Sequence, residues 1–371
     1  MGDHWRDGSV SATWGTLFQV TVFGESHAAG LGCVISGMPP GFPLDLDLVR
    51  EAMQRRAPNR TSASTKRQEK DHFEILCGYL HGRTTGTPLA AIIRNRDQHS
   101  GDYKELETLL RPGHADYTGL VKYRGAGDIR GGGHFSGRIT APLVFAGAAA
   151  RQVLAARGIT VGAHVQEIAG IQDAAFNTFS AAELLLPEQG EFPVLEAERG
   201  REMLEAVEKA RLELDSVGGM VEVAAAGVPA GLGEPFFDSL ESCFAHMMFS
   251  VPGVKAVSFG DGLEMIRWRG SEANDSPRLE DGRIVFASNH SGGMNGGISN
   301  GMPIIFHVAF RPTASIARPQ DTVDYVSGKE AVLRLRGRHD ACIVPRACEV
   351  VKNAAAVVLL DLLMQADSHG Q

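Results

Sequence analysis

The sequence lacks most of the features that mark secreted, membrane and disulfide-bonded proteins. Its five cysteines are odd in number and include no C-x-x-C pair, a pattern typical of reduced thiols. The apolar run over residues 354–364 is interrupted by Asp361 and is too short to span a bilayer. Residues 1–15 contain no apolar segment of the kind found in secretory signals. These absences predict a cytoplasmic protein without a membrane span.

Excess basic charge and the common cofactor fingerprints are also missing. A net charge of -8 argues against nucleic acid or an anionic membrane as the main partner. The sequence has no H-E-x-x-H pattern and no cysteine–histidine cluster with ligand spacing, so we expect no metal. It contains neither a Walker A motif nor a G-x-G-x-x-G after an opening strand. A nucleotide-like cofactor would therefore need a less common scaffold.

The hydrophobic pattern predicts one domain of mixed α and β structure. Alternating apolar residues predict strands at 18–22 and 31–35, which would form a hairpin with residues 24–27 near its tip. Longer patterns predict helices at 45–56, 139–157, 195–217 and 348–365 and strands at 220–228 and 303–310. No repeat or linker divides the chain, so we expect a single domain over 11–371. The polar residues 1–10 are expected to be disordered or foreign to the natural protein.

The stretch Gly24-Glu25-Ser26-His27 places a carboxylate, a hydroxyl and an imidazole side by side at the end of a predicted strand. One interpretation is the nucleophile elbow of a serine hydrolase, because the segment is one residue away from G-x-S-x-G. The other is a polar edge of a binding pocket. An elbow needs a helix after the turn, whereas the next segment has strand periodicity. This favours the pocket and leaves a hydrolase with Ser26 as nucleophile as the alternative.

Glycine, histidine and arginine gather in the irregular segments. The Gly131-Gly132-Gly133 turn precedes a predicted helix, whose first N–H groups could bind a phosphate, although such turns are as often only turns. His27, His114 and His339 lie among glycines and charged residues, which suits proton transfer near neutral pH. The basic stretch 55–71 is either a solvated loop or a mobile lid. A substrate with several negative groups would explain all the arginines in these segments, which are Arg55, Arg56, Arg60, Arg67, Arg111, Arg138, Arg311, Arg338 and Arg346.

The same segments resemble the motifs of one family, in order along the chain. FGESHAAGLG, RPGHADYTGLVKY and GGGHFSGRITAPLVFAGAAA are followed by GVPAGLGEPFFDSL, SVPGVKAVSFGDG, HSGGMNGGISNG, RPTASIA and GRHDACIVPRA. Together they resemble chorismate synthase from about Trp14 to Met364. The resemblance implies a lyase that removes phosphate and a ring hydrogen from 5-enolpyruvylshikimate 3-phosphate by 1,4-anti elimination, giving chorismate in the last step of the shikimate pathway. It also implies reduced FMN as cofactor, with NADPH as a possible reductant, and no nucleic acid or membrane partner.

The resemblance also implies a fold and a set of site residues. The fold would be α+β, a β-α-β sandwich with helices between antiparallel sheets, assembled as a homotetramer. His27 would be the acid near the departing phosphate, His114 would hold or protonate the reduced flavin, and Asp340 would assist proton removal. The implied flavin contacts are His134, Phe135, Ser136, Gly296, Arg311, Pro312, Thr313, Ala314, Ser315 and Arg338. The implied substrate contacts are Ser26, Arg56, Arg60, Arg111, Arg138 and Arg338.

Three segments depart from the family pattern, one of which is the basic stretch 55–71, where the family's tyrosine is missing. Ala28 replaces the glycine that follows G-E-S-H, and His134-Phe135 replaces Arg-Ser in the flavin segment. The second change removes one cation and one hydroxyl. A homologue that binds FMN without turnover is therefore a third interpretation.

Overall fold

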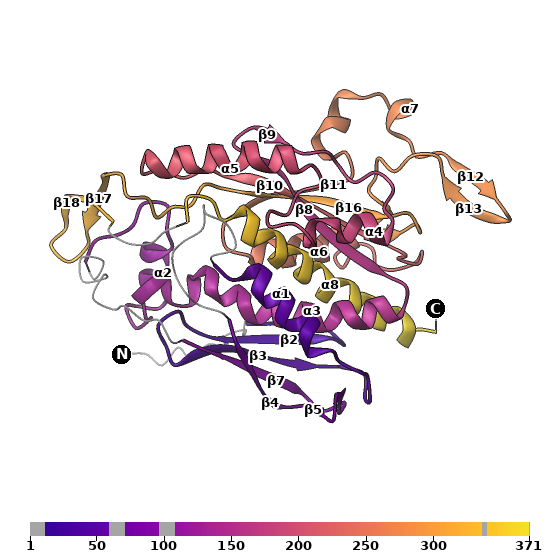
Figure 1. Ribbon diagram of the computed structural model, residues 1–371, viewed down its shortest axis with the longest axis horizontal. Coiled ribbons are helices and arrows are strands. Elements are labelled where there is room, and N and C mark those ends of the chain that lie inside the picture. Colours follow the sequence, from indigo (N-terminus) through magenta and orange to yellow (C-terminus); the bar gives the residue numbers. More distant parts are fainter. Residues whose placement is uncertain (1–11, 59–70, 96–107, 336–339, 371) are drawn as a thin grey trace.

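Two five-stranded antiparallel sheets form the frame of the computed structural model, which describes residues 12–58, 71–95, 108–335 and 340–370 (Figure 1). The first sheet has the strand order β1 (Thr13–Trp14), β2 (Gln19–Gly24), β3 (Gly30–Ser36), β7 (Leu89–Arg94), β4 (Phe73–Cys77). The second has the order β11 (Val254–Phe259), β16 (Ile304–Phe310), β10 (Gly219–Ala226), β8 (Thr160–Ile168), β9 (Ile171–Gln172). The predicted mixture of helices and strands, of the α+β class, is confirmed.

Three helices lie between the sheets in Figure 1: α1 (Leu46–Arg56), α3 (Thr140–Ala156) and α8 (Val344–Ser368). Helix α3 packs against α8 and β3, and α8 packs in turn against β8 and β10. The two long helices approach closely at Gly147, where a Cβ would lie 2.2 Å from the backbone oxygen of Asn353. Any larger residue there would push the helices apart, so glycine at this position sets the spacing of the central layer.

Helix α3 owes its apolar character to burial. The helical stretch Gly137–Ala156 is long and apolar enough to cross a membrane, but 72% of the tested window is buried inside the protein. A core helix in contact with another helix and a sheet passes the same test as a membrane span. The composition of α3 therefore reflects its place in the core.

The remaining elements lie around this frame. Helix α5 (Ala197–Leu212) and helix α4 (Ala181–Leu185) pack on the second sheet, and α6 (Leu240–Ser250) packs on α8 and β11. Helix α2 (Asp116–Lys122) follows the segment that contains His114. The other short elements are β5 (Tyr79–Leu80), β6 (Arg83–Thr84), α7 (Gly270–Ala273), β12 (Pro277–Glu280), β13 (Arg283–Phe286), β14 (Met294–Asn295), β15 (Ile298–Ser299), β17 (Gln320–Asp324) and β18 (Lys329–Leu333).

The predicted elements are confirmed with shifted ends. The helix expected over 195–217 ends at Leu212, because Leu214 takes a left-handed conformation with φ of 61°. The closing helix expected from Cys348 begins at Val344, since a proline in its first turn needs no hydrogen-bonded N–H. The predicted hairpin is β2–β3, in register from Gln19 opposite Ser36 to Gly24 opposite Leu31.

Asp361 on α8 ties the start of the first sheet to the central layer. Its buried carboxylate accepts the backbone N–H groups of Thr16, Leu17 and Phe18 at 2.7 to 3.0 Å. Gln365 donates a further hydrogen bond to it at 2.8 Å. A charge within an apolar helix is tolerated because these donors replace water around it.

Candidate active site

The Gly131-Gly132-Gly133 turn lies directly against the tip of the β2–β3 hairpin. All three glycines have positive φ, of 59°, 88° and 53°. The Gly133 carbonyl accepts the N–H of Ser26 at 3.1 Å. Nδ1 of His134 lies 3.0 Å from the Gly24 carbonyl oxygen, which can only accept, so His134 donates. These contacts fix the turn on the hairpin.

The same turn separates two of the predicted catalytic histidines. A Cβ on Gly131 would lie 2.2 Å from Nδ1 of His27 and 2.9 Å from Oγ of Ser26. A Cβ on Gly132 would lie 3.4 Å from Nε2 of His114. Side chains at either position would therefore displace or cover an imidazole. The glycines are required here by close approach as well as by backbone conformation.

His114 is held by a carboxylate that also holds an arginine. Its Nδ1 lies 2.7 Å from Oδ1 of Asp116, and Arg111 donates to the same carboxylate from Nε at 2.8 Å and from Nη2 at 2.6 Å. Burial alone would raise the pKa of Asp116, but the hydrogen bonds from His114 and Arg111 hold that pKa far below its usual range. Asp116 is therefore ionised at neutral pH.

Two further arginines share a second buried carboxylate. Arg56 is 2% exposed and forms an ion pair with Asp71, and Nη1 of Arg138 lies 3.6 Å from the other oxygen of Asp71. Arg56 also donates to Thr140 Oγ1 at 3.2 Å, and Arg138 donates to Asn95 Oδ1 at 2.9 Å. Two guanidinium groups thus converge on one buried carboxylate, an arrangement of cations that suits an anionic ligand.

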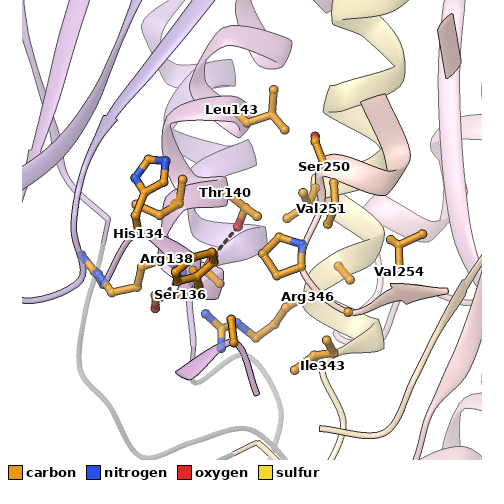
Figure 2. A pocket seen from close by; sticks show the side chains of 18 of the residues that line it. His134, Ser136, Arg138, Thr140, Leu143, Ser250, Val251, Val254, Ile343 and Arg346 are labelled. Carbon is orange, nitrogen blue, oxygen red and sulfur yellow. Dashed lines mark hydrogen bonds between the residues drawn. The ribbon is translucent and has the colours of Figure 1, made fainter. Parts of the chain in front are cut away.

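A cavity of about 770 Å³ brings most of the predicted site residues together. Figure 2 shows His134, Ser136 and Arg138 on one side of it and Val251, Val254 and Ile343 on the other. The predicted residues that line it are Arg56, Arg111, His114, His134, Phe135, Ser136, Arg138, Arg311, Pro312, Thr313, Ala314, Ser315 and Asp340. Among the described lining residues, six are arginine or lysine and one, Asp340, is acidic. This excess of basic side chains favours an anionic ligand in the cavity.

Some predicted residues lie elsewhere. Ser26 and His27 are buried behind Gly131, which itself lines the cavity. Gly296, in the turn between β14 and β15, does not line the cavity. Arg60 and Arg338 lie outside the described residues, as does the histidine candidate His339.

The structure adds a wall that no individual residue prediction included. Ser250 at the end of α6 and the following residues 251–255 line the cavity opposite the glycine turn. His246 on α6 is exposed and also lines the cavity. The motif SVPGVKAVSFGDG pointed to this segment, but its apolar residues carry no chemical signal that would mark them as ligand contacts.

The segment 311–315 is joined to the His114 turn through Arg311. Its Nη1 donates to the Gly113 carbonyl at 2.8 Å, and its Nε donates to the Pro312 carbonyl at 3.1 Å. A Cβ on Gly113 would lie 2.6 Å from this guanidinium, so glycine leaves room for it. Asp340, which also lines the cavity, accepts from Nη1 of Arg346 at 2.5 Å. The His114 turn and Asp340 are thus each contacted by an arginine side chain.

Two buried hydroxyls in this region fit a ligand rich in hydrogen-bonding groups. Within the described part of the chain, Oγ of Ser26 and Oγ1 of Thr313 have no hydrogen-bond partner. Buried polar atoms normally find one, so each is a candidate to bind a phosphate or ring group of a ligand.

The geometry does not support a serine nucleophile. Gly24-Glu25-Ser26-His27 joins strand β2 to strand β3, so no helix follows the turn as in an elbow. The hydroxyl of Ser26 makes no hydrogen bond to a histidine among the described residues. A base within hydrogen-bond reach is what activates a serine.

A second polar cluster lies in the other sheet and does not line the cavity. The fully buried His164 places Nδ1 3.0 Å from Asp173 and Nε2 2.6 Å from Glu222. Burial alone would lower the pKa of His164, but its hydrogen bonds to the two carboxylates raise it. Hydrogen bonds from His164 and His307 outweigh the effect of burial and lower the pKa of Glu222 to about 2. The cluster holds β8 to β10.

Comparison with known proteins agrees with this site. The chorismate synthase family model matches residues 18–364. The chorismate synthase of Korarchaeum cryptofilum is 43% identical over 353 residues, which cover 95% of this chain and 97% of that protein. That of Aeropyrum pernix is 45% identical over 350 residues, covering 94% and 92%. A crystal structure of chorismate synthase superposes with a TM-score of 0.74 at 28% identity, covering 95% of this chain and 93% of the other. The chain belongs to the chorismate synthase family.

Proposed function

We propose that this protein is a chorismate synthase that eliminates phosphate and a ring hydrogen from 5-enolpyruvylshikimate 3-phosphate to give chorismate. The observation that carries the proposal is the charge of the cavity, where six basic side chains face one acidic side chain among the described lining residues. The substrate has two carboxylates and one phosphate. Guanidinium groups bind both kinds of anion with two parallel hydrogen bonds.

Reduced FMN is the proposed cofactor, with NADPH as a possible reductant. The glycine turn, the orphan hydroxyl of Thr313 and the cation of Arg311 fit a flavin with its phosphate. The proposed flavin contacts are His134, Phe135, Ser136, the segment 311–315 and, outside this cavity or the described residues, Gly296 and Arg338. When bound, the reduced flavin supplies an electron-rich ring system to a reaction that is redox-neutral overall.

Two histidines have the proposed proton-transfer roles. His27 donates a proton to the phosphate as its bond to the ring breaks. The substrate contact Ser26 precedes it in the chain, and the substrate contact Arg138 is joined to the same turn through Asn95, which accepts from Arg138 and donates to the carbonyls of residues 25 and 28. His114 holds the cofactor or exchanges a proton with it from the cavity wall. Both roles suit imidazole, whose ordinary pKa is near neutrality.

Anion binding is assigned to the buried arginines, and removal of the ring hydrogen is assigned to Asp340. Arg56 and Arg111 bind the carboxylates or the phosphate, with Arg60 as a further contact outside the described residues. Asp340 assists loss of the ring proton, and Arg346 sets its orientation at 2.5 Å. Because Asp71 and Asp116 already hold these arginines in place, little side-chain entropy remains to be lost on binding.

We further propose that the chain forms a single β-α-β sandwich domain and acts in the cytoplasm as a homotetramer. Helices α3 and α8 between two sheets support the layer order (Figure 1). The described cysteines are all free, which supports a reducing compartment. Phe236 and Phe237 are 90% and 89% exposed, and such apolar surface supports self-association.

The test is anaerobic incubation with dithionite-reduced FMN and 5-enolpyruvylshikimate 3-phosphate, with chorismate absorbance and phosphate release followed together. We expect both products in equal amounts. His27→Ala and His114→Ala should lower turnover by roughly 10²-fold or more, whereas the remote and exposed His369→Ala should not. No product from the folded wild-type protein, beside an active control enzyme, would refute the proposal.

A further inference from the structure

The carboxylate of Asp116 receives four hydrogen bonds, and one of them joins it to His114. Oδ1 lies 2.7 Å from Nδ1 of His114 and 2.6 Å from Nη2 of Arg111. Oδ2 accepts the backbone N–H of Arg111 at 2.9 Å and its Nε at 2.8 Å. The side chains of Asp116 and Arg111 are 12% and 5% exposed, so little water competes for these bonds. Asp116 is absent from the residues that line the cavity.

The ionised carboxylate determines which nitrogen of His114 holds the proton. An ionised carboxylate only accepts hydrogen bonds, so the 2.7 Å contact requires that Nδ1 donate. In the neutral ring Nε2 is then the unprotonated nitrogen. This is the nitrogen that can take up and return a proton.

The free nitrogen faces the glycine turn. A Cβ on Gly132 would lie 3.4 Å from Nε2 and 3.5 Å from Cε1 of His114. Glycine at this position therefore leaves the Nε2 edge uncovered, and both His114 and the neighbouring Gly131 line the cavity. The ring is anchored on its Nδ1 side and open on its Nε2 side.

We propose that Asp116 is a positioning residue that fixes the Nδ1–H tautomer of His114 and sets Arg111 beside it through the same carboxylate. This inference rests on the proposed function for its catalytic consequence, but the tautomer itself does not. Carboxylates that orient a metal-binding histidine affect activity by about 10- to 100-fold when removed, and we expect an effect of the same order for His114. Asp116→Asn should therefore lower turnover by about that factor.

The tautomer is tested in the free protein by nitrogen NMR of [15N]histidine-labelled samples, titrated upward until the rings are neutral. The His114 signals are assigned by their loss in His114→Gln. We expect the wild-type ring to show protonated Nδ1 and unprotonated Nε2, and Asp116→Asn to shift it toward the Nε2–H form. The matched control is Asp367→Asn. The carboxylate of Asp367 accepts two hydrogen bonds from Arg157, at 2.8 and 2.9 Å, on an exposed surface. The control should leave the His114 signals unchanged.

A double-mutant comparison tests the catalytic consequence. If Asp116 acts through His114, His114→Ala combined with Asp116→Asn should lose no more turnover than His114→Ala alone. The inference would be overturned if the loss of turnover in the double variant equalled the product of the losses in the two single variants. An Nε2–H tautomer of His114 in the wild type would also overturn it, and this measurement does not depend on any variant folding. If the wild type forms no chorismate, the proposed function fails while the NMR result still decides the role of Asp116.

Discussion

Replacing Gly131 by alanine should displace His27 while leaving the fold intact. A Cβ at this position would lie 2.1 Å from Cε1 and 2.2 Å from Nδ1 of His27. Carbon atoms in contact prefer about 3.5 to 4.0 Å, so the ring has to retreat by more than ~1 Å. The flexible element in this contact is the imidazole, because Gly133 pins the turn to Ser26 through a backbone hydrogen bond.

The magnitude has two parts. The left-handed conformation of residue 131, with φ of 59°, costs alanine roughly 1–2 kcal/mol of stability. Misplacing a proton donor by ~1 Å costs on the order of 10²-fold in rate. We therefore expect a fall in the melting temperature of a few degrees and a loss of turnover of about 10²-fold. Scanning calorimetry and the anaerobic chorismate assay measure the two quantities separately.

Gly158→Ala is the matched control for this change. Gly158 also has positive φ, at 78°, but a Cβ there would meet nothing within 4 Å, and it lies at the far end of α3. It should show the same loss of stability and no loss of turnover. In a His27→Ala background, Gly131→Ala should cost little further turnover, because the ring it displaces is gone. Turnover of Gly131→Ala within a few-fold of Gly158→Ala would refute the reasoning.

Three further outcomes are expected. Asp361→Ala should lower the free energy of unfolding by on the order of 3–5 kcal/mol in urea denaturation, because three backbone N–H groups at residues 16–18 lose their acceptor; a loss below ~1 kcal/mol would contradict this. Gly119→Ala should weaken FMN binding by about tenfold in a fluorescence titration, since its Cβ would lie 2.7 Å from the ring of Phe135, which follows the glycine turn. Adding Phe135→Ala should relieve the clash, and an unchanged affinity of the single variant would count against the prediction. Because the pKa of His164 is raised in the folded state, its contribution to stability is complete below the unfolded pKa of ~6.5 and is lost as pH rises through the folded pKa. Between these two pKa values the free energy of unfolding should fall with pH in the wild type and stay flat in His164→Gln. Equal dependence on pH in the two proteins would disprove the assignment.

The sequence predicts local structure well because its patterns are local. Alternation marks the β2–β3 hairpin, and an Ala-rich run ending in glycine marks α3. The order of strands is a different matter: β3 pairs with β7, whose partner choice depends on contacts across more than 50 residues and has no signal in either strand. Asp71 shows the same limit, since it follows a basic stretch of sequence and becomes a counter-ion for two arginines only when the fold brings them together.

The sequence predicts the site residues where a motif also contains chemically reactive or charged side chains. Histidines and arginines in turn-rich segments indicated an anion site, and 13 of the predicted residues line one cavity. The wall at 251–255 was not predicted, because valine, proline and glycine occur in cores and turns of every kind and do not by themselves indicate a ligand contact. Asp116 lies only two residues from His114, but no pattern distinguishes a carboxylate that orients an imidazole from one exposed to solvent.

The central position of α8 determines when the chain can complete its fold during synthesis. The ribosome makes the strands of both sheets before α8, and Asp361 on that helix binds backbone groups 343 to 345 positions earlier in the chain. Until α8 emerges, the apolar faces it covers on β8 and β10 have no helix against them. Exposed sheet surface in nascent chains favours aggregation. We expect nascent chains stalled before Val344 to depend on chaperones for solubility, and to become native only once this helix has been released.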